Sequence, residues 1–307
     1  MNKENNFISA VLYVHNHEHH IRALIEALNA VFCRHFKKFE IICVNDCSDD
    51  GSVAIIRECA QNIREGAVVL IHTGFYQGLE SAMIAGVDYA SGDFVFEFDS
   101  LRLDYDISVI MEVYQKCISG CDIVGASSSA KLKKSSRMFY SLFNKHSHTQ
   151  YQIKTELFRI LSRRAINRIH QMSLTIPYRK AIYANCGLKY ENITYQAIGA
   201  ESVYNEDPSY RQSLAFDSLI IFTNIAYKIS ITLTILMICF SVFSGIYTFT
   251  IFLSGNPVAG WTTTMMVLSV GFLGIFGILS IIIKYLSVIV NLIFKKMKYV
   301  IGNIERL

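Results

Sequence analysis

The chain has 307 residues, of which 52% are hydrophobic and only 18% are charged, and its formal net charge is +4. So apolar a composition is typical of membrane proteins, and a mild positive charge gives no indication of a nucleic-acid partner. The eight cysteines include no C-x-x-C pair, and several lie in apolar runs, so we expect them to be reduced thiols.

Short apolar runs alternate with segments of helical periodicity along the first 126 residues. This alternation predicts an α/β fold, a mainly parallel sheet with helices on both faces. No G-x-G-x-x-G follows the first run, which disfavours a dinucleotide-binding fold. We expect strands at 7–14, 39–44, 67–72, 94–98 and 122–126, and helices at 21–32, 52–63, 79–90 and 104–119.

Polar residues follow three of the predicted strands, at positions 15–18, 45–46 and 99–100. In open parallel sheets, ligands bind outside the carboxyl ends of the strands. We therefore expect these segments to form the functional site. His15, His17 and their neighbours fit no structural zinc spacing, so we expect the histidines to border a ligand pocket instead.

The C-terminal part contains a run of 55 residues, 229–283, without Asp, Glu, Lys or Arg. One membrane span needs about 20 apolar residues, so the run predicts a two-helix transmembrane hairpin. We expect the helices at 229–253 and 265–294, joined by a turn containing Gly255 and Pro257. A buried helical hairpin in a soluble protein is the alternative.

Lysines flank this run at both ends, while the loop between the predicted helices contains none. Such flanks lie on the cytoplasmic side, so we expect a multi-pass protein of the inner (cytoplasmic) membrane with both termini in the cytoplasm. Residues 1–212 would form the cytoplasmic domain and 295–307 a cytoplasmic tail. The flanking lysines are Lys228, Lys295, Lys296 and Lys298.

Basic residues precede an aromatic-rich segment within residues 130–170, a pattern typical of helices on an anionic membrane surface. A solvated helix face is the alternative reading. A second interfacial helix is expected at 213–228. The basic residues of the first segment are Lys131, Lys133, Lys134 and Arg137.

Three motifs carry a resemblance to a known family. His15-Asn16-His17-Glu18 stands where the family has Tyr-Asn-Glu-Glu, residues 44–50 read Val-Asn-Asp-Cys-Ser-Asp-Asp, and residues 82–93 match its Ala-x-x-Ala-Gly-x-x-x-Ala-x-Gly-Asp helix. The chain thus resembles the GT-A domain of family 2 glycosyltransferases. The likeness extends in particular to membrane-anchored polyprenyl-phosphate glycosyltransferases and dolichyl-phosphate mannose synthases.

The resemblance implies a site for a nucleotide-sugar, with Asn16, Glu18, Asp46 and Asp99 at the nucleotide. The family's metal-binding Asp-x-Asp falls on Asp99-Ser100-Leu101, so its second carboxylate is absent. Glu97 lies two residues before Asp99 and hence on the same strand face. Asp99 and Glu97 are therefore the expected ligands of Mg²⁺ or Mn²⁺.

Further catalytic positions also depart from the family pattern. Of the usual Gln-Asp-Pro-Pro only Asp104 survives, and the acceptor-site Gly-Asp-Phe-Arg aligns with Glu156-Leu157-Phe158-Arg159. The one-residue offset is expected to turn Glu156 away from the position of the missing acid. We name Asp99, Asp104 and Glu156 as catalytic candidates. Arg159 is added to the basic residues expected to bind lipid phosphate, since a guanidinium suits phosphate.

The resemblance implies an enzyme that moves a sugar from a nucleotide-diphosphate donor, a UDP-sugar, to polyprenyl phosphate at the cytoplasmic leaflet. Because three motifs are altered, a catalytically inactive membrane partner or scaffold is the alternative. Transfer to a growing lipid-linked glycan is a third reading. The resemblance also leaves a homo-oligomer open.

Overall fold

The structure is a computed structural model, and it describes most of the α/β part and a smaller share of the C-terminal part. Two units separate, residues 1–144, 149–214 and 296–307 in one and 145–148 and 215–295 in the other, and each is considered by itself. The described residues are 3–130, 134–147, 149–172, 178–198, 215–219, 223, 228–229, 232–233, 235–237, 239–240, 243, 260–294 and 299–307.

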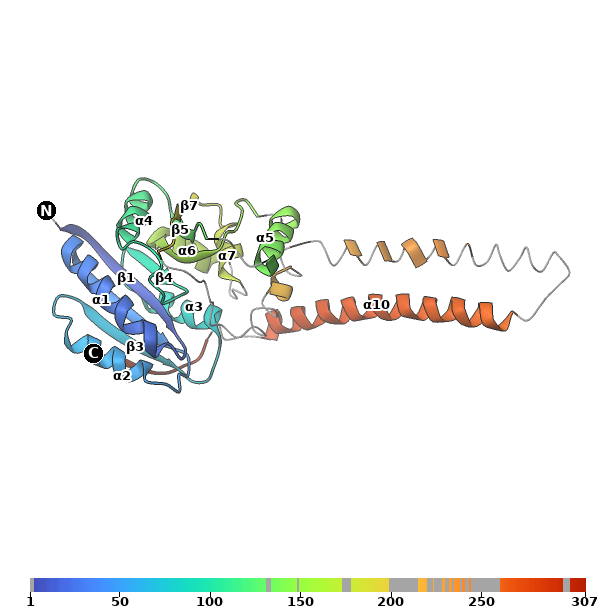
Figure 1. Cartoon of the computed structure of the whole chain (residues 1–307), viewed down its shortest axis with the longest axis horizontal. Helices are drawn as coiled ribbons and strands as arrows, with labels where there is room; N and C mark the ends of the chain where they lie inside the picture. Colours follow the sequence, from blue (N-terminus) through green and yellow to red (C-terminus); the bar gives the residue numbers. More distant parts are fainter. Residues whose placement is uncertain are drawn as a thin grey trace. The chain divides into compact units, whose positions relative to one another are not determined.

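The first unit, whose helices α1 to α7 are labelled in Figure 1, is built around an eight-stranded sheet. The order of its strands is β7-β5-β6-β4-β1-β2-β3-β8. The five predicted strands are confirmed as β1 to β5, and three further strands were not predicted. The strands are β1 (Glu4–Val14), β2 (Phe36–Asn45), β3 (Ala67–Thr73), β4 (Phe94–Phe98), β5 (Ile123–Ser128), β6 (Glu156–Ser162), β7 (Tyr190–Tyr195) and β8 (Ile301–Arg306).

The middle of the sheet, β4-β1-β2-β3, is parallel, as predicted. Strand β6 lies antiparallel between β4 and β5, and β7 is parallel to β5. At the other edge, β8 adds to β3 in antiparallel orientation. The last residues, expected only as a tail, thus complete the sheet of the first unit.

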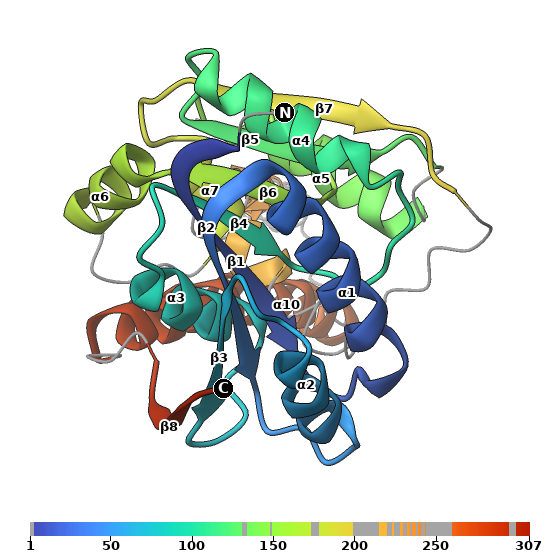
Figure 2. The ribbon, with the colours of Figure 1, turned by 90° about the vertical axis from the view of Figure 1, so that its left-hand side faces the viewer.

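The four predicted helices are confirmed as α1 to α4, and three more follow in the same unit. Helices α1 and α2 lie on one side of β1 to β3, whereas α3 lies on the other (Figure 2). The helices are α1 (Glu18–His35), α2 (Ser52–Gln61), α3 (Leu79–Tyr89), α4 (Ser108–Ile118), α5 (Lys134–His146), α6 (Arg163–Met172) and α7 (Arg179–Tyr183).

Alternation along the strands supplies an apolar surface to each face of the sheet. On the first face, Leu12 and Phe96 are fully buried in one core with residues of α1, α2 and α4. On the second face, α3 approaches the strands through Gly86. A Cβ there would lie 2.2 Å from a methyl group of Val11 and 2.8 Å from one of Val44, so only glycine allows this approach.

The second unit contains the long helix α10 (Trp261–Phe294), which covers the predicted helix 265–294. Small residues of α10 face the preceding segment: a Cβ on Gly274 would lie 2.5 Å from Sδ of Met237, and one on Gly277 would lie 3.3 Å from a methyl group of Leu233. Most of the predicted helix 229–253 lies outside the described residues.

The prediction of membrane spans finds no confirmation in this unit. Within the described part of the chain, no helix combines the length and the apolar character needed to cross a bilayer. Of the predicted interfacial helix 213–228, residues 215–219 are helical and most of the others lie outside the described residues.

Candidate active site

The three polar segments meet at one edge of the sheet. Strand β1 pairs in parallel with β2, where Val14 lies opposite Asn45, and with β4, where Leu12 lies opposite Phe98. The segments that follow these strands therefore leave the sheet side by side, as predicted.

The segments after β1 and β2 are joined by hydrogen bonds between their side chains and backbone N–H groups. The Asp50 carboxylate accepts hydrogen bonds from the backbone N–H of Glu18, at 2.9 Å, and of Ser52, at 3.0 Å, at the starts of α1 and α2. In return, Oε2 of Glu18 accepts one from the N–H of Gly51 at 2.9 Å. Asn16, in the left-handed region at φ 55°, accepts a bond from the N–H of Asp49. Glu18 and Asn16 thus hold the segment that precedes α2, and their nucleotide contacts stay a prediction.

Asp46 is fully buried and holds the loop between β3 and α3. Its carboxylate accepts hydrogen bonds from the N–H of Gln77 at 2.9 Å, the N–H of Gly78 at 2.7 Å and the hydroxyl of Thr73 at 2.9 Å. Gly78 has φ 80°, a conformation that favours glycine. The predicted nucleotide residue is therefore also the anchor of this loop.

Val300, the residue before β8, forms hydrogen bonds with the same loop. The Gln77 side-chain amide donates to the carbonyl of Val300 at 2.6 Å and accepts from its N–H at 2.8 Å. The N–H of Gly74 also donates to the Val300 carbonyl. Between these anchors, Phe75 and Tyr76 are 58% and 44% exposed, and the Tyr76 ring lies 4.7 Å from that of His15.

Asp99 belongs to a cluster of buried charges, which we call the arginine–carboxylate cluster. It consists of four carboxylates and three cations, from β4, β6, α3 and α7. Its members are Glu80, Glu97, Asp99, Glu156, Arg159, Arg179 and Lys180.

Arg159 is fully buried and binds three carboxylates of the cluster. Its Nη1 lies 2.5 Å from Oε2 of Glu97, its Nη2 lies 2.5 Å from Oδ2 of Asp99, and its Nε lies 2.9 Å from Oε2 of Glu156. The predicted role of Arg159 at lipid phosphate has no support in this geometry, because the guanidinium faces carboxylates inside the domain.

Arg179, which the sequence reasoning missed, is the second buried guanidinium. Its Nε donates to Glu80 at 2.9 Å and its Nη2 donates to Asp99 at 2.8 Å. Its Nη1 lies 3.0 Å from Oε2 of Glu97 without hydrogen-bond geometry, so this contact is ionic. The Tyr183 hydroxyl donates to the other Glu97 oxygen at 2.7 Å. Arg179 begins α7, which has only five residues, so no helical periodicity in the sequence indicated its place.

Glu156 joins the cluster through a β-bulge, against the expectation that its side chain turns away. Ala126 pairs with Phe158 but Ser127 pairs with Glu156, so Leu157 is an extra residue on β6. A bulge reverses the alternation of side chains beyond it, and this returns Glu156 to the face of Arg159.

The Glu156 side chain lies directly over Gly125 of β5. A Cβ on Gly125 would lie only 2.5 Å from Cδ of Glu156. Glycine at this position therefore leaves the space that the carboxylate needs. In the sequence Gly125 is simply a small residue in a strand, and the residue that fills the space comes from another strand.

Opposing charges set the pKa values in the cluster. Burial by itself would raise the pKa of Asp99, but the nearby Arg159 and Arg179, with Lys180, hold it well below its usual range. Burial by itself would lower the pKa of both arginines. The surrounding carboxylates outweigh this effect, so the pKa of each arginine is raised. Asp99, Arg159 and Arg179 are thus charged in the folded protein.

The other predicted site residues lie apart from this cluster or outside the described residues. Asp104 accepts a hydrogen bond from the Tyr195 hydroxyl at 3.0 Å, and burial raises the pKa of its carboxyl. Lys131 and Lys133 lie outside the described residues. Lys134 begins α5 and Arg137 is exposed on it, so their lipid-phosphate role stays a prediction.

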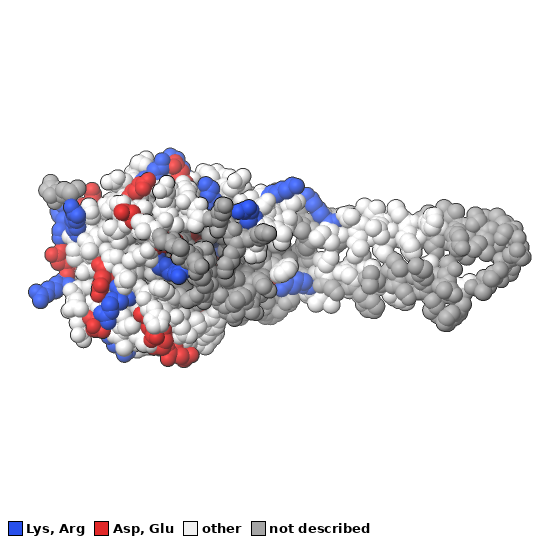
Figure 3. Space-filling model, viewed as in Figure 1, with Lys and Arg blue, Asp and Glu red and all other residues white. Residues whose placement is uncertain are grey.

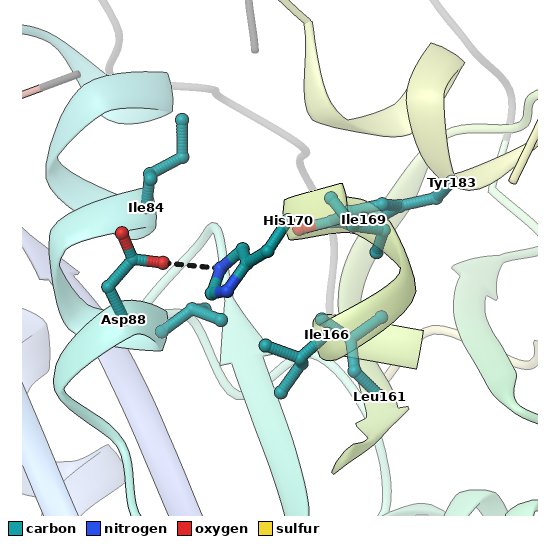
Figure 4. A pocket seen from close by; sticks show the side chains of 8 residues that line it. Ile84, Asp88, Leu161, Ile166, Ile169, His170 and Tyr183 are labelled. Carbon is teal, nitrogen blue, oxygen red and sulfur yellow. Dashed lines mark ion pairs between the residues drawn. The ribbon is translucent and has the colours of Figure 1, made fainter. Parts of the chain in front are cut away.

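A small pocket lies between α3 and α6 (Figure 4). Its cavity of about 10 Å³ holds roughly one water molecule, far below the volume of a nucleotide-sugar. At its edge, Nε2 of His170 lies 2.6 Å from Oδ1 of Asp88. This pocket is therefore not the donor site.

The cluster does not fit the Mg²⁺ or Mn²⁺ expected at Asp99 and Glu97. The two carboxylates share a face, as predicted, but guanidinium groups already hold them. Leu101, at the second position of the motif, is 1% exposed and packs in the core. No group of His, Cys, Asp or Glu side chains in the described part of the chain is arranged to hold a metal ion.

Comparison with known proteins decides the family. The model for glycosyl transferase family 2 matches residues 9–169, just over half of the chain. The protein belongs to this family. It is thus a glycosyltransferase. The matched range contains the strand-end segments and five of the seven cluster residues, all except Arg179 and Lys180.

Three relatives illustrate the similarity of this glycosyltransferase to known proteins. A prophage bactoprenol glucosyl transferase homologue of Escherichia coli is 27% identical over 97% of this chain and 99% of that protein. An undecaprenyl-phosphate 4-deoxy-4-formamido-L-arabinose transferase of Edwardsiella ictaluri is 27% identical over 56% of this chain and 54% of that protein. An uncharacterised glycosyltransferase of Synechocystis is 29% identical, and the chain spans 58% of its length.

A solved structure shows the same fold. The mannosyltransferase of Pyrobaculum calidifontis, in complex with GDP-Man and Mn²⁺, superposes with a TM-score of 0.50 at 14% identity. The match covers 71% of this chain and 63% of that one. The predicted GT-A fold is therefore confirmed for the first unit.

Proposed function

We propose that this glycosyltransferase moves a sugar from a nucleotide-diphosphate donor, a UDP-sugar, to polyprenyl phosphate at the cytoplasmic leaflet. The alignment with the bactoprenol glucosyl transferase homologue over nearly the whole of both chains carries this proposal. The meeting of the three strand-end segments at one sheet edge supports it, because ligands of such sheets bind there.

The proposed reaction asks for little covalent help from the protein. The lipid phosphate is already an anionic nucleophile, and the nucleoside diphosphate leaves as the glycosidic bond to it breaks. The protein therefore has to align the two substrates and stabilise the charge that develops on the departing diphosphate. Asn16, Glu18 and Asp46 are proposed at the nucleotide, and Asp99 beside the diphosphate.

We also propose that the second unit holds the enzyme at the inner membrane, with both termini in the cytoplasm. The uncharged run 229–283 and the lysines at its flanks support this location. In Figure 3 the described atoms of α10 are mostly uncharged, while Lys, Arg, Asp and Glu mark the first unit. Glycines of α10 facing Met237 and Leu233 also suit helix packing in membranes. Retention in the pellet after alkaline carbonate extraction of membranes is expected, and full release would contradict the proposal.

Radiolabelled transfer tests the activity. Membranes containing the full chain are incubated with labelled UDP-glucose and undecaprenyl phosphate, and the label is followed into the lipid phase. We expect lipid-linked label that depends on the chain. If other UDP-sugars also give no product while UDP still binds, the protein is instead a non-catalytic partner.

A further inference from the structure

The arginine–carboxylate cluster occupies the place where the family's sequence motif puts a divalent cation. A cation such as Mn²⁺ needs several oxygen ligands with free lone pairs facing a common point. Asp99 keeps the first ligand position, but the second is Leu101, whose side chain is 1% exposed in the core. The motif therefore offers a single carboxylate.

Every carboxylate oxygen of Asp99 and Glu97 already has a partner. Oδ1 of Asp99 receives Nη2 of Arg179 at 2.8 Å, and Oδ2 receives Nη2 of Arg159 at 2.5 Å. In Glu97, Oε2 receives Nη1 of Arg159 at 2.5 Å, and Oε1 receives the hydroxyl of Tyr183 at 2.7 Å. A metal ion would have to displace these donors.

Such a displacement is strongly unfavourable. The side chains of Arg159 and Arg179 are 0% and 1% exposed, so a metal would leave two guanidinium groups buried without their counter-ions. Breaking one buried ion pair typically costs about 3–5 kcal/mol, and the added divalent charge would stand beside both cations. The two arginines therefore take the place of the metal ion as counter-ions of Asp99 and Glu97.

Lys180 differs from the two arginines in its access to the surface. Its side chain is 13% exposed, and its Nζ lies 3.9 Å from Oδ2 of Asp99. The ammonium donates a hydrogen bond to the carbonyl of Glu156 at 3.1 Å, which leaves further N–H groups for a ligand. Of the three cations in the cluster, Lys180 is the one that a diphosphate can reach.

From these contacts we infer that the enzyme works without a divalent cation at Asp99, and that protein cations divide the metal's two tasks. Arg159 and Arg179 neutralise and fix the carboxylates, and Lys180 supplies positive charge to the donor diphosphate. This inference rests on the proposed transfer from a nucleotide-diphosphate donor.

Metal dependence is tested on the full chain in membranes. Transfer is measured after EDTA treatment and again with added Mn²⁺, and we expect the two rates to agree. Loss of transfer in EDTA with recovery in Mn²⁺ would overturn the inference while leaving the proposed function intact.

A second measurement does not depend on turnover. Mn²⁺ binding to the purified chain is followed by electron paramagnetic resonance, with and without UDP, in the wild type and in Asp99→Asn. We expect Mn²⁺ binding to be the same in the wild type and in Asp99→Asn. This result would support the inference even if no transfer were found with any donor. Binding of Mn²⁺ that requires Asp99 would overturn it.

The role of Lys180 is tested by binding of UDP and of uridine, which lacks the diphosphate. Lys180→Met should weaken UDP binding about tenfold, the equivalent of one charge-assisted hydrogen bond, and leave uridine binding unchanged. Lys180→Arg should retain UDP binding, and Lys189→Met, which removes an exposed lysine paired with Glu191, serves as the control. Equal effects on both ligands, or none on UDP, would overturn this role.

Discussion

Glu97 and Arg159 lie directly opposite each other on the antiparallel strands β4 and β6, with Nη1 of Arg159 2.5 Å from Oε2 of Glu97. Both side chains are completely buried. Charges so deep in a domain are stable only when their partners are held in good geometry. The sheet register supplies that geometry, because paired residues on neighbouring strands have fixed separations.

Removal of Arg179 should strongly destabilise the protein. Arg179→Ala leaves the buried carboxylates of Glu80 and Glu97 with fewer counter-ions, and we expect a loss of about 3–5 kcal/mol in the free energy of unfolding. Urea unfolding followed by circular dichroism measures this loss. The control is Arg164→Ala, since the Arg164 side chain is 76% exposed and should contribute little. Similar unfolding curves for the two variants would contradict the cluster's structural role.

The contact between Gly125 and Glu156 predicts a coupling between the two positions. Gly125→Ala places a Cβ 2.5 Å from Cδ of Glu156, and such overpacking typically costs about 1–3 kcal/mol. In a Glu156→Ala background the same substitution should cost clearly less, because the colliding atoms are absent. A double-mutant cycle of unfolding free energies measures the difference. Additive effects would show that the side chain does not lie over the glycine.

Substitution of Asp46 should affect both stability and nucleotide binding. Asp46→Ala leaves the N–H groups of Gln77 and Gly78 without an acceptor, at a cost of roughly 1–3 kcal/mol for each buried group. Asp46→Asn keeps one acceptor oxygen and should cost less. Thermal unfolding ranks the variants, and calorimetry with UDP shows whether Asp46→Asn loses binding while it stays folded. Retained UDP binding in folded Asp46→Asn would remove Asp46 from the nucleotide site.

Stability should fall as the pH decreases below about 6.5, the ordinary pKa of histidine. Burial lowers the pKa of His17, and the positive charges of His20 and His15 lower it further. The unfolded chain therefore takes up a proton at a higher pH than the folded one, so this contribution is complete above about 6.5 and is lost as the pH falls through the folded pKa. Protonation also removes Nδ1 of His17 as the acceptor for the N–H of His15.

Urea unfolding at pH 7.5 and pH 5.5 tests this dependence. His17→Asn should reduce the difference between the two pH values, since it removes the titrating ring. His19→Asn is the control, because the His19 side chain is 86% exposed. An unchanged pH dependence in His17→Asn would contradict the assignment.

Loss of the Gln77 side chain should loosen the C-terminal strand. Gln77→Ala removes both hydrogen bonds to the backbone of Val300, and we expect faster hydrogen exchange at residues 300–306 and at Gly74. Asn62→Ala, at the exposed residue that follows α2, should leave exchange there unchanged. Equal protection in wild type and Gln77→Ala would show that the sheet pairing with β3 alone secures this strand.

Local sequence patterns were sufficient for the central part of the fold. Strands β1 to β5 and helices α1 to α4 follow from apolar runs and helical spacing, because both signals lie within one segment of chain. Parallel pairing then brings Asn16, Asp46 and Asp99 to one edge of the sheet, as expected from the alternation alone. The motif around Asp46 identified the family for the same reason.

Only the tertiary structure decided the contacts between residues that are far apart in the chain. The bulge at Leu157 turns Glu156 toward Arg159, and its effect depends on the register with β5. Arg179 reaches Asp99 across 80 positions, and Val300 reaches Gln77 across 223. No local period encodes such contacts, since each depends on which strands and helices become neighbours. The sequence by itself thus determined the family and the edge of the sheet at which the site lies, whereas only the folded chain decided that buried arginines hold the carboxylates expected to bind a metal.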